Sequence, residues 1–166
     1  MAKFLIVGFM GSGKSSLLHQ IKGKEKLKSF KFFDLDDVIE GKLQAPIQEI
    51  IKQRGMNHFR QLEFQHLSSI LTSKEDCIVA LGGGTLNDDT YDLILKNHAK
   101  LIWLDTPFNL CLQRIRMEGN KRPLNKLDDL ELKELYLNRC KYYKKASLII
   151  TDEIEKLIQF ITSSTI

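Results

Sequence analysis

The chain has 166 residues, a formal net charge of +4 at pH 7 and 43% hydrophobic residues. This length favours a single folded domain, and the composition excludes a disordered or collagen-like chain. The apolar runs are far shorter than the roughly 20 residues of a membrane-spanning helix, so we expect no contact with a membrane interior. Three widely spaced cysteines indicate neither a disulfide framework nor a zinc site, and they favour a cytoplasmic protein.

Short apolar runs alternate along the chain with longer amphipathic stretches. Most of the runs lack polar alternation, which is typical of a parallel sheet covered by helices on both faces. We therefore predict a three-layer α/β fold in which residues 1–166 form one domain. The predicted strands are Phe4–Gly8, Phe30–Asp34, Cys77–Leu81, Leu101–Asp105 and Leu148–Thr151. The predicted helices are Lys14–Ile21, Pro46–Gln53, Arg60–Leu71, Asp88–Lys96, Pro107–Met117, Leu130–Lys144 and Glu153–Ile161.

Residues 8–15 read GFMGSGKS and match the pattern GxxxxGK[ST] between a predicted strand and a predicted helix. Glycines in such a loop let backbone N–H groups converge on phosphate oxygens. Lys14 can reach the β- and γ-phosphates of a nucleotide, and the Ser15 hydroxyl suits Mg²⁺. The residues expected to contact the nucleotide are Gly11, Ser12, Gly13, Lys14, Ser15 and Ser16.

Residues 125–128 read NKLD and match the tetrapeptide that GTPases use to recognise guanine. Here the tetrapeptide follows residues 121–124, which read KRPL, instead of a buried strand, and this argues against a GTPase. The surrounding segment Glu118–Asp129 is polar and contains Gly119 and Pro123. We predict that it forms a mobile loop.

Two carboxylates, Asp34 and Asp36, stand at the end of the second predicted strand. In a parallel α/β sheet this end faces the ligand crevice, where one carboxylate can support Mg²⁺ and another can orient an acceptor hydroxyl. The alternative is a cluster that caps a helix beginning near Val38, because Asp favours that position. The sequence leaves both interpretations open.

A run of glycines, Gly82, Gly83 and Gly84, follows the third predicted strand and allows a close approach of backbone to a ligand. Single arginines on helices, such as Arg60 and Arg139, are usually solvated. Arg116 and Arg122 flank the polar loop, from which they could close over phosphate groups.

Taken together, these segments resemble the shikimate kinase family. The resemblance rests on GFMGSGKS, FFDLDDVIE (residues 32–40), FRQLE (59–63), LGGG (81–84), RPL (122–124) and RCKYYKKAS (139–147), in order and at matching spacing. It implies a nucleoside-monophosphate-kinase-like fold with a five-stranded parallel sheet. It also implies transfer of the γ-phosphate of ATP to the 3-hydroxyl of shikimate, with Mg²⁺ as cofactor.

The resemblance also implies roles for single residues. Asp34 and Ser15 would support Mg²⁺, and Glu63 would fix the Arg60 side chain. The catalytic residues would be Lys14, Asp36 and Arg122, with Arg116 and Arg122 reaching ATP from a lid over about 116–127. A helical region over about 35–62 would bind shikimate, and the substrate-binding residues would be Asp36, Arg60, Gly82, Gly83, Gly84 and Arg139.

This sequence departs from the family pattern at Ile51, at Met56 and at Asn125, which bear on substrate affinity and lid packing. Another small-metabolite kinase, acting on gluconate or a nucleotide, is the leading alternative. A nucleotide-binding protein without catalysis is a second one. Nucleic-acid binding by Arg139–Lys145 is a third, although acidic residues are spread throughout the chain. We expect a monomer whose partners are ATP and shikimate, with no nucleic acid and no membrane.

Overall fold

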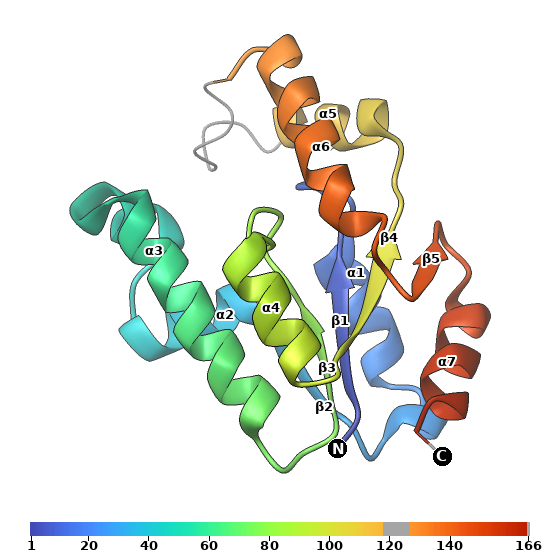
Figure 1. The fold of residues 1–166 in the computed structure, drawn as a ribbon. Helices are drawn as coiled ribbons and strands as arrows, with labels where there is room; N and C mark the ends of the chain where they lie inside the picture. Colours follow the sequence, from blue (N-terminus) through green and yellow to red (C-terminus); the bar gives the residue numbers. More distant parts are fainter. Residues whose placement is uncertain (118–126, 166) are drawn as a thin grey trace.

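The computed structural model of the protein contains a five-stranded parallel sheet flanked by helices (Figure 1). The structure describes residues 1–117 and 127–165. The strand order is β2-β3-β1-β4-β5, so β1 lies at the centre of the sheet, and the predicted fold class is confirmed. The strands are β1 (Lys3–Val7), β2 (Lys31–Asp34), β3 (Cys77–Ala80), β4 (Lys100–Leu104) and β5 (Leu148–Ile150). The helices are α1 (Lys14–Lys22), α2 (Leu35–Leu43), α3 (Ile47–Thr72), α4 (Asp88–Lys96), α5 (Phe108–Met117), α6 (Asp129–Tyr143) and α7 (Ile154–Ser163), with a 3-10 turn at Glu25–Leu27.

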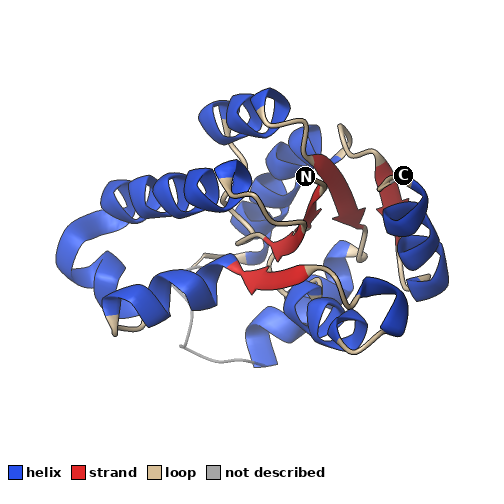
Figure 2. Cartoon of the chain, turned by 90° about the horizontal axis from the view of Figure 1, so that it is seen from below, coloured by secondary structure: helices blue, strands red, loops and turns tan. Residues whose placement is uncertain are grey.

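The side chains of β1 alternate between two apolar layers, one on each face of the sheet. Leu5 and Val7 contribute to the layer formed with α2 to α6, whereas Phe4 and Ile6 contribute to the layer formed with α1 and α7. Figure 2 shows helices on both sides of the strands. A strand that is buried on both faces has little need for polar residues, which explains the apolar run from Phe4 to Val7.

The helix α2 follows β2 without a connecting loop. The apolar pattern of the sequence does not mark this helix, although the capping interpretation and the family resemblance both imply helical structure in this region. The helix starts directly after β2 because the Asp34 carboxylate accepts a hydrogen bond from the Asp36 amide at 3.1 Å and so caps the first turn. The capping interpretation of this cluster is therefore confirmed. Capping does not conflict with a role in ligand binding, because both carboxylates also face the edge of the sheet where the site lies.

The predicted helices Pro46–Gln53 and Arg60–Leu71 are parts of α3, which is kinked at Gly55. Gly55 has φ 82° and ψ 165°, a conformation that other residues rarely adopt, so glycine permits the kink. The sequence pattern predicts two separate helices on either side of Gly55, whereas the structure has one kinked helix. The first part of α3 is anchored to α2, where the Glu40 carboxylate accepts from the Ile47 amide at 2.8 Å.

The helix α5 begins at Phe108, one residue later than predicted. The amides of Leu110 and Cys111 donate to the Pro107 carbonyl, so the chain turns into the helix at Pro107. Thr106, the residue before Pro107, is buried, and its hydroxyl donates to the Ser12 carbonyl at 2.8 Å. Thr106 therefore supports the loop after β1.

Because all strands run in the same direction, the segments that follow them meet at one edge of the sheet. The loop at residues 8–13 follows β1, and the turn at residues 82–84 follows β3. The β4–α5 connection at residues 105–107 lies on the other side of β1. Within residues 1–117 and 127–165, none of the helices has the length and apolar character required to cross a membrane.

Lys3, the first residue of β1, is a buried charged residue that holds the far end of α3. Only 3% of it is exposed, and its ammonium donates to the Ile70 carbonyl at 2.9 Å and the Glu75 carbonyl at 2.6 Å. A third bond reaches the Ser73 hydroxyl at 2.8 Å. Lys3 thus joins the central strand to the C-terminal end of α3, where free carbonyls favour a cation.

We predict that Lys3→Met lowers the free energy of unfolding by about 1–3 kcal/mol, because buried oxygens lose a charged donor. Denaturant unfolding monitored by circular dichroism measures this change. The control is Lys31→Met: Lys31 also opens a strand and pairs with Cys77 in register, but its side chain is exposed. An equal loss in both variants would contradict the role of the Lys3 bonds.

Candidate active site

Residues 8–15, the P-loop, form the turn between β1 and α1. Gly11 has φ 76°, and a Cβ there would lie 2.8 Å from the Cys111 carbonyl of α5, so glycine is required on both counts. The Lys14 ammonium folds back over the loop and donates to the Gly8 carbonyl at 2.8 Å and the Phe9 carbonyl at 2.9 Å. These bonds hold a cation at the mouth of the loop, where α1 also presents its positive end.

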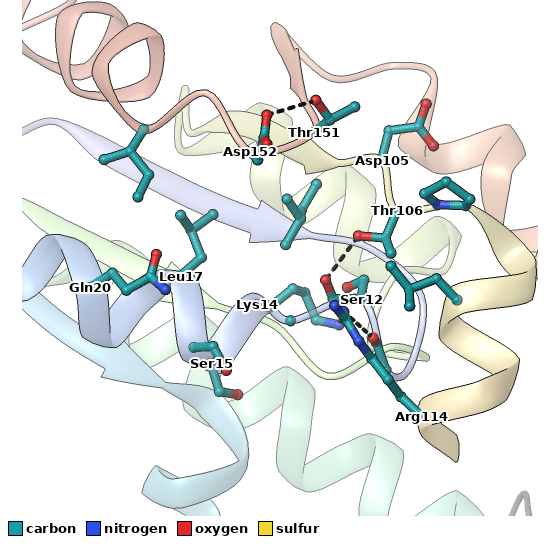
Figure 3. A pocket seen from close by; sticks show the side chains of 17 residues that line it. Ser12, Lys14, Ser15, Leu17, Gln20, Asp105, Thr106, Arg114, Thr151 and Asp152 are labelled. Carbon is teal, nitrogen blue, oxygen red and sulfur yellow. Dashed lines mark hydrogen bonds between the residues drawn. The ribbon is translucent and has the colours of Figure 1, made fainter. Parts of the chain in front are cut away.

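An open hollow of about 750 Å³, here called the nucleotide hollow, lies over the P-loop (Figure 3). Its other walls come from the β4–α5 connection and from the segment after β5, including Thr151 and Ile154. Six of the eight residues predicted to contact the nucleotide line it: Gly11, Ser12, Gly13, Lys14, Ser15 and Ser16.

Arg114 of α5, which the sequence analysis did not select, also lines the nucleotide hollow and donates to the Gly11 carbonyl at 2.9 Å (Figure 3). Arg116, which the sequence analysis did select, is exposed and is not among the residues lining this hollow. Its guanidinium donates to the Leu127 carbonyl at 2.8 Å and the Asp129 carboxylate at 2.7 Å. The physical reason is helical geometry: Arg114 shares the inward side of α5 with Cys111, and Arg116 lies well around the helix.

Ser15 and Asp34 bring two oxygen ligands together beside the P-loop. The Ser15 hydroxyl donates to the Asp34 carboxylate at 2.6 Å, across a separation of 19 residues. Within the described part of the chain no cluster of three or more His, Cys, Asp or Glu side chains could hold a metal ion. A site with one hydroxyl and one carboxylate fits Mg²⁺, which keeps several waters and takes phosphate oxygens as its remaining ligands.

A smaller hollow of about 260 Å³, here called the acceptor hollow, lies between α2, α3, α6 and the turn after β3. It falls below the roughly 300–1,000 Å³ of pockets for drug-sized ligands, which suits a small metabolite. Ile51 and Met56 contribute apolar wall on the side of α3. All six predicted substrate-binding residues line it: Asp36, Arg60, Gly82, Gly83, Gly84 and Arg139.

Residues 82–84, here called the glycine turn, lie against two guanidiniums at Gly84. A Cβ on Gly84 would lie 2.7 Å from Nη2 of Arg139 and would also collide with Nη2 of Arg60. Burial lowers the pKa of Arg139, and the neighbouring charge of Arg60 adds to this effect. Two cations held this close favour an anionic ligand between them.

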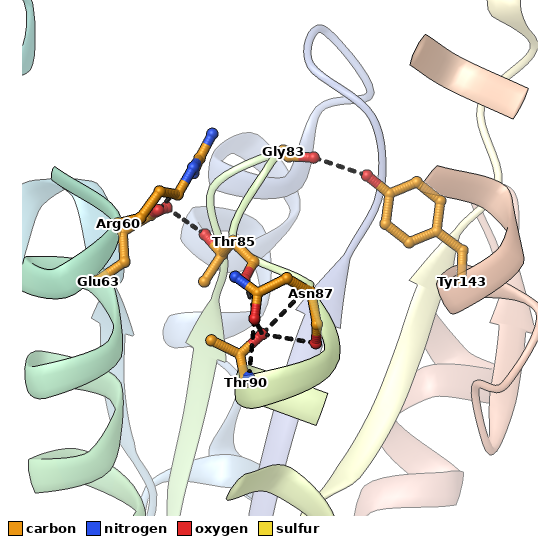
Figure 4. A network of polar contacts seen from close by, with 7 residues as sticks. All are labelled: Arg60, Glu63, Gly83, Thr85, Asn87, Thr90 and Tyr143. Carbon is orange, nitrogen blue, oxygen red and sulfur yellow. Dashed lines mark hydrogen bonds and ion pairs between the residues drawn. The ribbon is translucent and has the colours of Figure 1, made fainter. Parts of the chain in front are cut away.

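Glu63, one helical turn after Arg60, is 1% exposed and forms an ion pair with Arg60 (Figure 4). Thr85, directly after the glycine turn, donates its hydroxyl to the same carboxylate. The Thr85 carbonyl in turn accepts from the Thr90 hydroxyl of α4 at 2.8 Å. The predicted pairing of Glu63 with Arg60 is therefore present, and it is extended to the glycine turn by a threonine that the sequence analysis missed.

The P-loop and the glycine turn are in direct contact. A Cβ on Gly83 would lie 2.9 Å from the Met10 amide nitrogen, so only glycine lets the two loops meet. Met10 itself lines the acceptor hollow, whereas Gly11 lines the nucleotide hollow. The two hollows therefore share the P-loop as a common wall.

Some predicted features lie outside the described residues, namely Arg122, Asn125 and most of the predicted lid. Asp128, the last residue of the NKLD tetrapeptide, caps α6: its carboxylate accepts from the Glu131 amide at 2.8 Å. The basic segment Arg139–Lys145 does not form one exposed face, because Tyr143 is buried and Arg139 turns to the acceptor hollow.

A family model described as shikimate kinase matches residues 10–166. A shikimate kinase from Persephonella marina is 37% identical over 153 residues, which cover 92% of this chain and 90% of that protein. A solved structure of shikimate kinase from Acinetobacter baumannii in complex with shikimate has a TM-score of 0.85 and 27% identity, covering 100% of this chain and 96% of that one. The crystal structure of shikimate kinase from Aquifex aeolicus has a TM-score of 0.79 and 27% identity, covering 98% and 95%. The matches extend over nearly the whole chain, and the chain belongs to the shikimate kinase family.

Proposed function

We propose that this chain binds ATP in the nucleotide hollow and shikimate in the acceptor hollow, and transfers the γ-phosphate to the 3-hydroxyl of shikimate. The observation that carries this proposal is the contact between the P-loop and the glycine turn at Met10 and Gly83. A terminal phosphate on the P-loop would face an acceptor held against the glycine turn. Because phosphoryl transfer depends mainly on positioning and charge, such a juxtaposition supports the reaction.

On the nucleotide side, Lys14 would leave the Gly8 and Phe9 carbonyls and offset the charge of the β- and γ-phosphates. Ser15 and Asp34 would hold Mg²⁺, Ser15 directly and Asp34 through water, in place of their mutual hydrogen bond. Bound Mg²⁺ supplies charge neutralisation at the phosphates. Arg114, fixed to the Gly11 carbonyl, would contact the nucleotide from the side of α5.

On the acceptor side, Arg60 and Arg139 would bind the carboxylate of shikimate. Both guanidiniums converge on the glycine turn, and a planar carboxylate can accept two parallel N–H bonds from each. Asp36 would accept a hydrogen bond from the reacting hydroxyl and orient it toward the phosphate. The helical region over about 35–62 thereby acts as the shikimate-binding part of the domain.

The proposal also retains the lid predicted over about 116–127, from which Arg122 would reach the transferring phosphate. A cation there would lower the barrier by stabilising charge that develops in the transition state. We also propose that the chain acts as a monomer, because the residues of both hollows come from one chain. Sedimentation at working concentrations measures that assembly state.

The test of the function is ADP release from ATP and Mg²⁺ with one acceptor at a time. We expect release that depends on shikimate and is absent with gluconate, quinate and nucleoside monophosphates. Release with another acceptor alone would retain the kinase and discard the acceptor assignment. Bound ATP without release for any acceptor would favour a nucleotide-binding protein instead.

We predict that Arg60→Lys raises the KM for shikimate roughly 10- to 100-fold and leaves the KM for ATP unchanged. Lysine keeps the positive charge beside Glu63 but loses the planar fork that binds a carboxylate. Steady-state kinetics with each substrate varied in turn measures both constants. The matched control is Arg54→Lys. Arg54 lies on the same helix, directly before the kink at Gly55, and its side chain is exposed. An equal shift in both variants, or a shift in the KM for ATP alone, would contradict the assignment.

We predict that Arg114→Ala raises the Kd for ATP roughly tenfold or more, because the variant loses a cation beside the phosphates and a bond that shapes the P-loop. Arg116→Ala, two residues away on the same helix, is expected to change that constant by less than about twofold, as for an exposed ion pair. Titration of each variant with ATP in the absence of acceptor measures the affinities. A larger loss of ATP affinity in Arg116→Ala than in Arg114→Ala would instead assign the nucleotide contact to Arg116.

A further inference from the structure

Tyr143, the last residue of α6, connects that helix to the glycine turn. Its side chain is 2% exposed, and its hydroxyl donates to the Gly83 carbonyl at 2.9 Å (Figure 4). The two residues are 60 positions apart, so this bond joins two elements that the chain itself does not connect. Neither ATP nor shikimate chemistry requires a phenol at this position, and the site as described does not use it.

The direction of this hydrogen bond is fixed. A carbonyl oxygen only accepts, so the phenol must donate. Burial raises the pKa of the Tyr143 phenol, which keeps the proton on the oxygen at neutral pH. The ring is held from the other side by Trp103 of β4, with ring centroids 5.9 Å apart. The hydroxyl therefore has a defined position relative to the sheet.

Arg139 lies four residues before Tyr143, one turn earlier on the same side of α6. Its guanidinium approaches the same turn: Nη1 lies 3.4 Å from the position of a Cβ on Gly83. It also lies over the Phe9 ring, 5.3 Å from the centroid. The distance between α6 and the glycine turn therefore decides where the Arg139 guanidinium is held in the acceptor hollow.

We propose that Tyr143 is a positioning residue for the acceptor: its bond to Gly83 fixes the spacing between the glycine turn and α6, and so holds Arg139 where a carboxylate binds. This inference rests on the proposed function, because it concerns the same acceptor hollow. Tyr143 touches neither substrate in this scheme. Its effect passes through the Gly83 carbonyl and through Arg139.

The experiment compares Tyr143→Phe with Tyr142→Phe. Both variants remove one hydroxyl and keep the ring, but the Tyr142 hydroxyl donates to the exposed Asp88 carboxylate at 2.7 Å. We expect Tyr143→Phe to raise the KM and the Kd for shikimate roughly three- to tenfold, the range for one lost hydrogen bond, with the KM for ATP unchanged. Tyr142→Phe is expected to leave all three constants unchanged.

A double variant tests whether Tyr143 acts through Arg139. In the Arg139→Lys background the fork that Tyr143 positions is already lost, so we expect the addition of Tyr143→Phe to alter the shikimate Kd by less than about twofold. A full, additive loss in that background would overturn the coupling. Hydrogen exchange at the amides of residues 83–85 gives a readout that does not depend on activity. We expect faster exchange in Tyr143→Phe than in the unmodified protein, and no change in Tyr142→Phe.

The outcomes separate this inference from the function on which it rests. If the unmodified protein releases no ADP with shikimate, the proposed function fails. If it does so, but Tyr143→Phe leaves the shikimate constants unchanged or shifts the ATP and shikimate constants equally, the positioning role is overturned. A lower melting temperature with unchanged shikimate constants would likewise overturn it, because Tyr143 would then act on stability alone.

Discussion

The whole site depends on a stretch of backbone without side chains at the carboxyl end of β3. A Cβ at Gly83 would meet the P-loop, and one at Gly84 would meet both guanidiniums of the acceptor hollow. Any other residue at position 83 would push the P-loop and the glycine turn apart, and these two elements must meet for a phosphate to reach an acceptor. The glycine turn thus fixes the separation of the two hollows by excluded volume alone, before any hydrogen bond is considered.

Charge then decides what these hollows can hold. Arg60 is balanced by the buried Glu63 carboxylate, whereas burial lowers the pKa of Arg139. A protein keeps a guanidinium in this position at a cost in desolvation, and an anionic ligand offsets that cost. On the other side of the P-loop, Lys14 holds its charge against carbonyl oxygens that a phosphate would outcompete. The site is therefore suited to bind anionic groups on both sides of the P-loop.

The sequence predicted the features that depend on residue type and local spacing. The strands, the P-loop and the six residues of the acceptor hollow follow from apolar runs, glycines and the family resemblance, and the structure brings the six together. Its apolar pattern does not mark α2, because a helix that starts directly on a strand has no separate turn signal; only the capping interpretation and the family resemblance imply helical structure there. It selected Arg116 over Arg114, although helical periodicity counted from the apolar Cys111 points to Arg114.

The remaining misses are single hydroxyls with distant partners. Thr106 reaches Ser12 across 94 positions, Thr85 reaches Glu63 across 22, and Tyr143 reaches Gly83 across 60. No pattern in a single sequence marks such residues, because Ser, Thr and Tyr are common in turns and helices. Two of these positions nevertheless follow from the topology. Thr85 comes after β3 and Thr106 after β4, and these strands are the two neighbours of β1, so the two threonines lie on opposite sides of the P-loop. A hydroxyl after each neighbouring strand holds the loops of the site together, and Tyr143 adds the helix that carries Arg139.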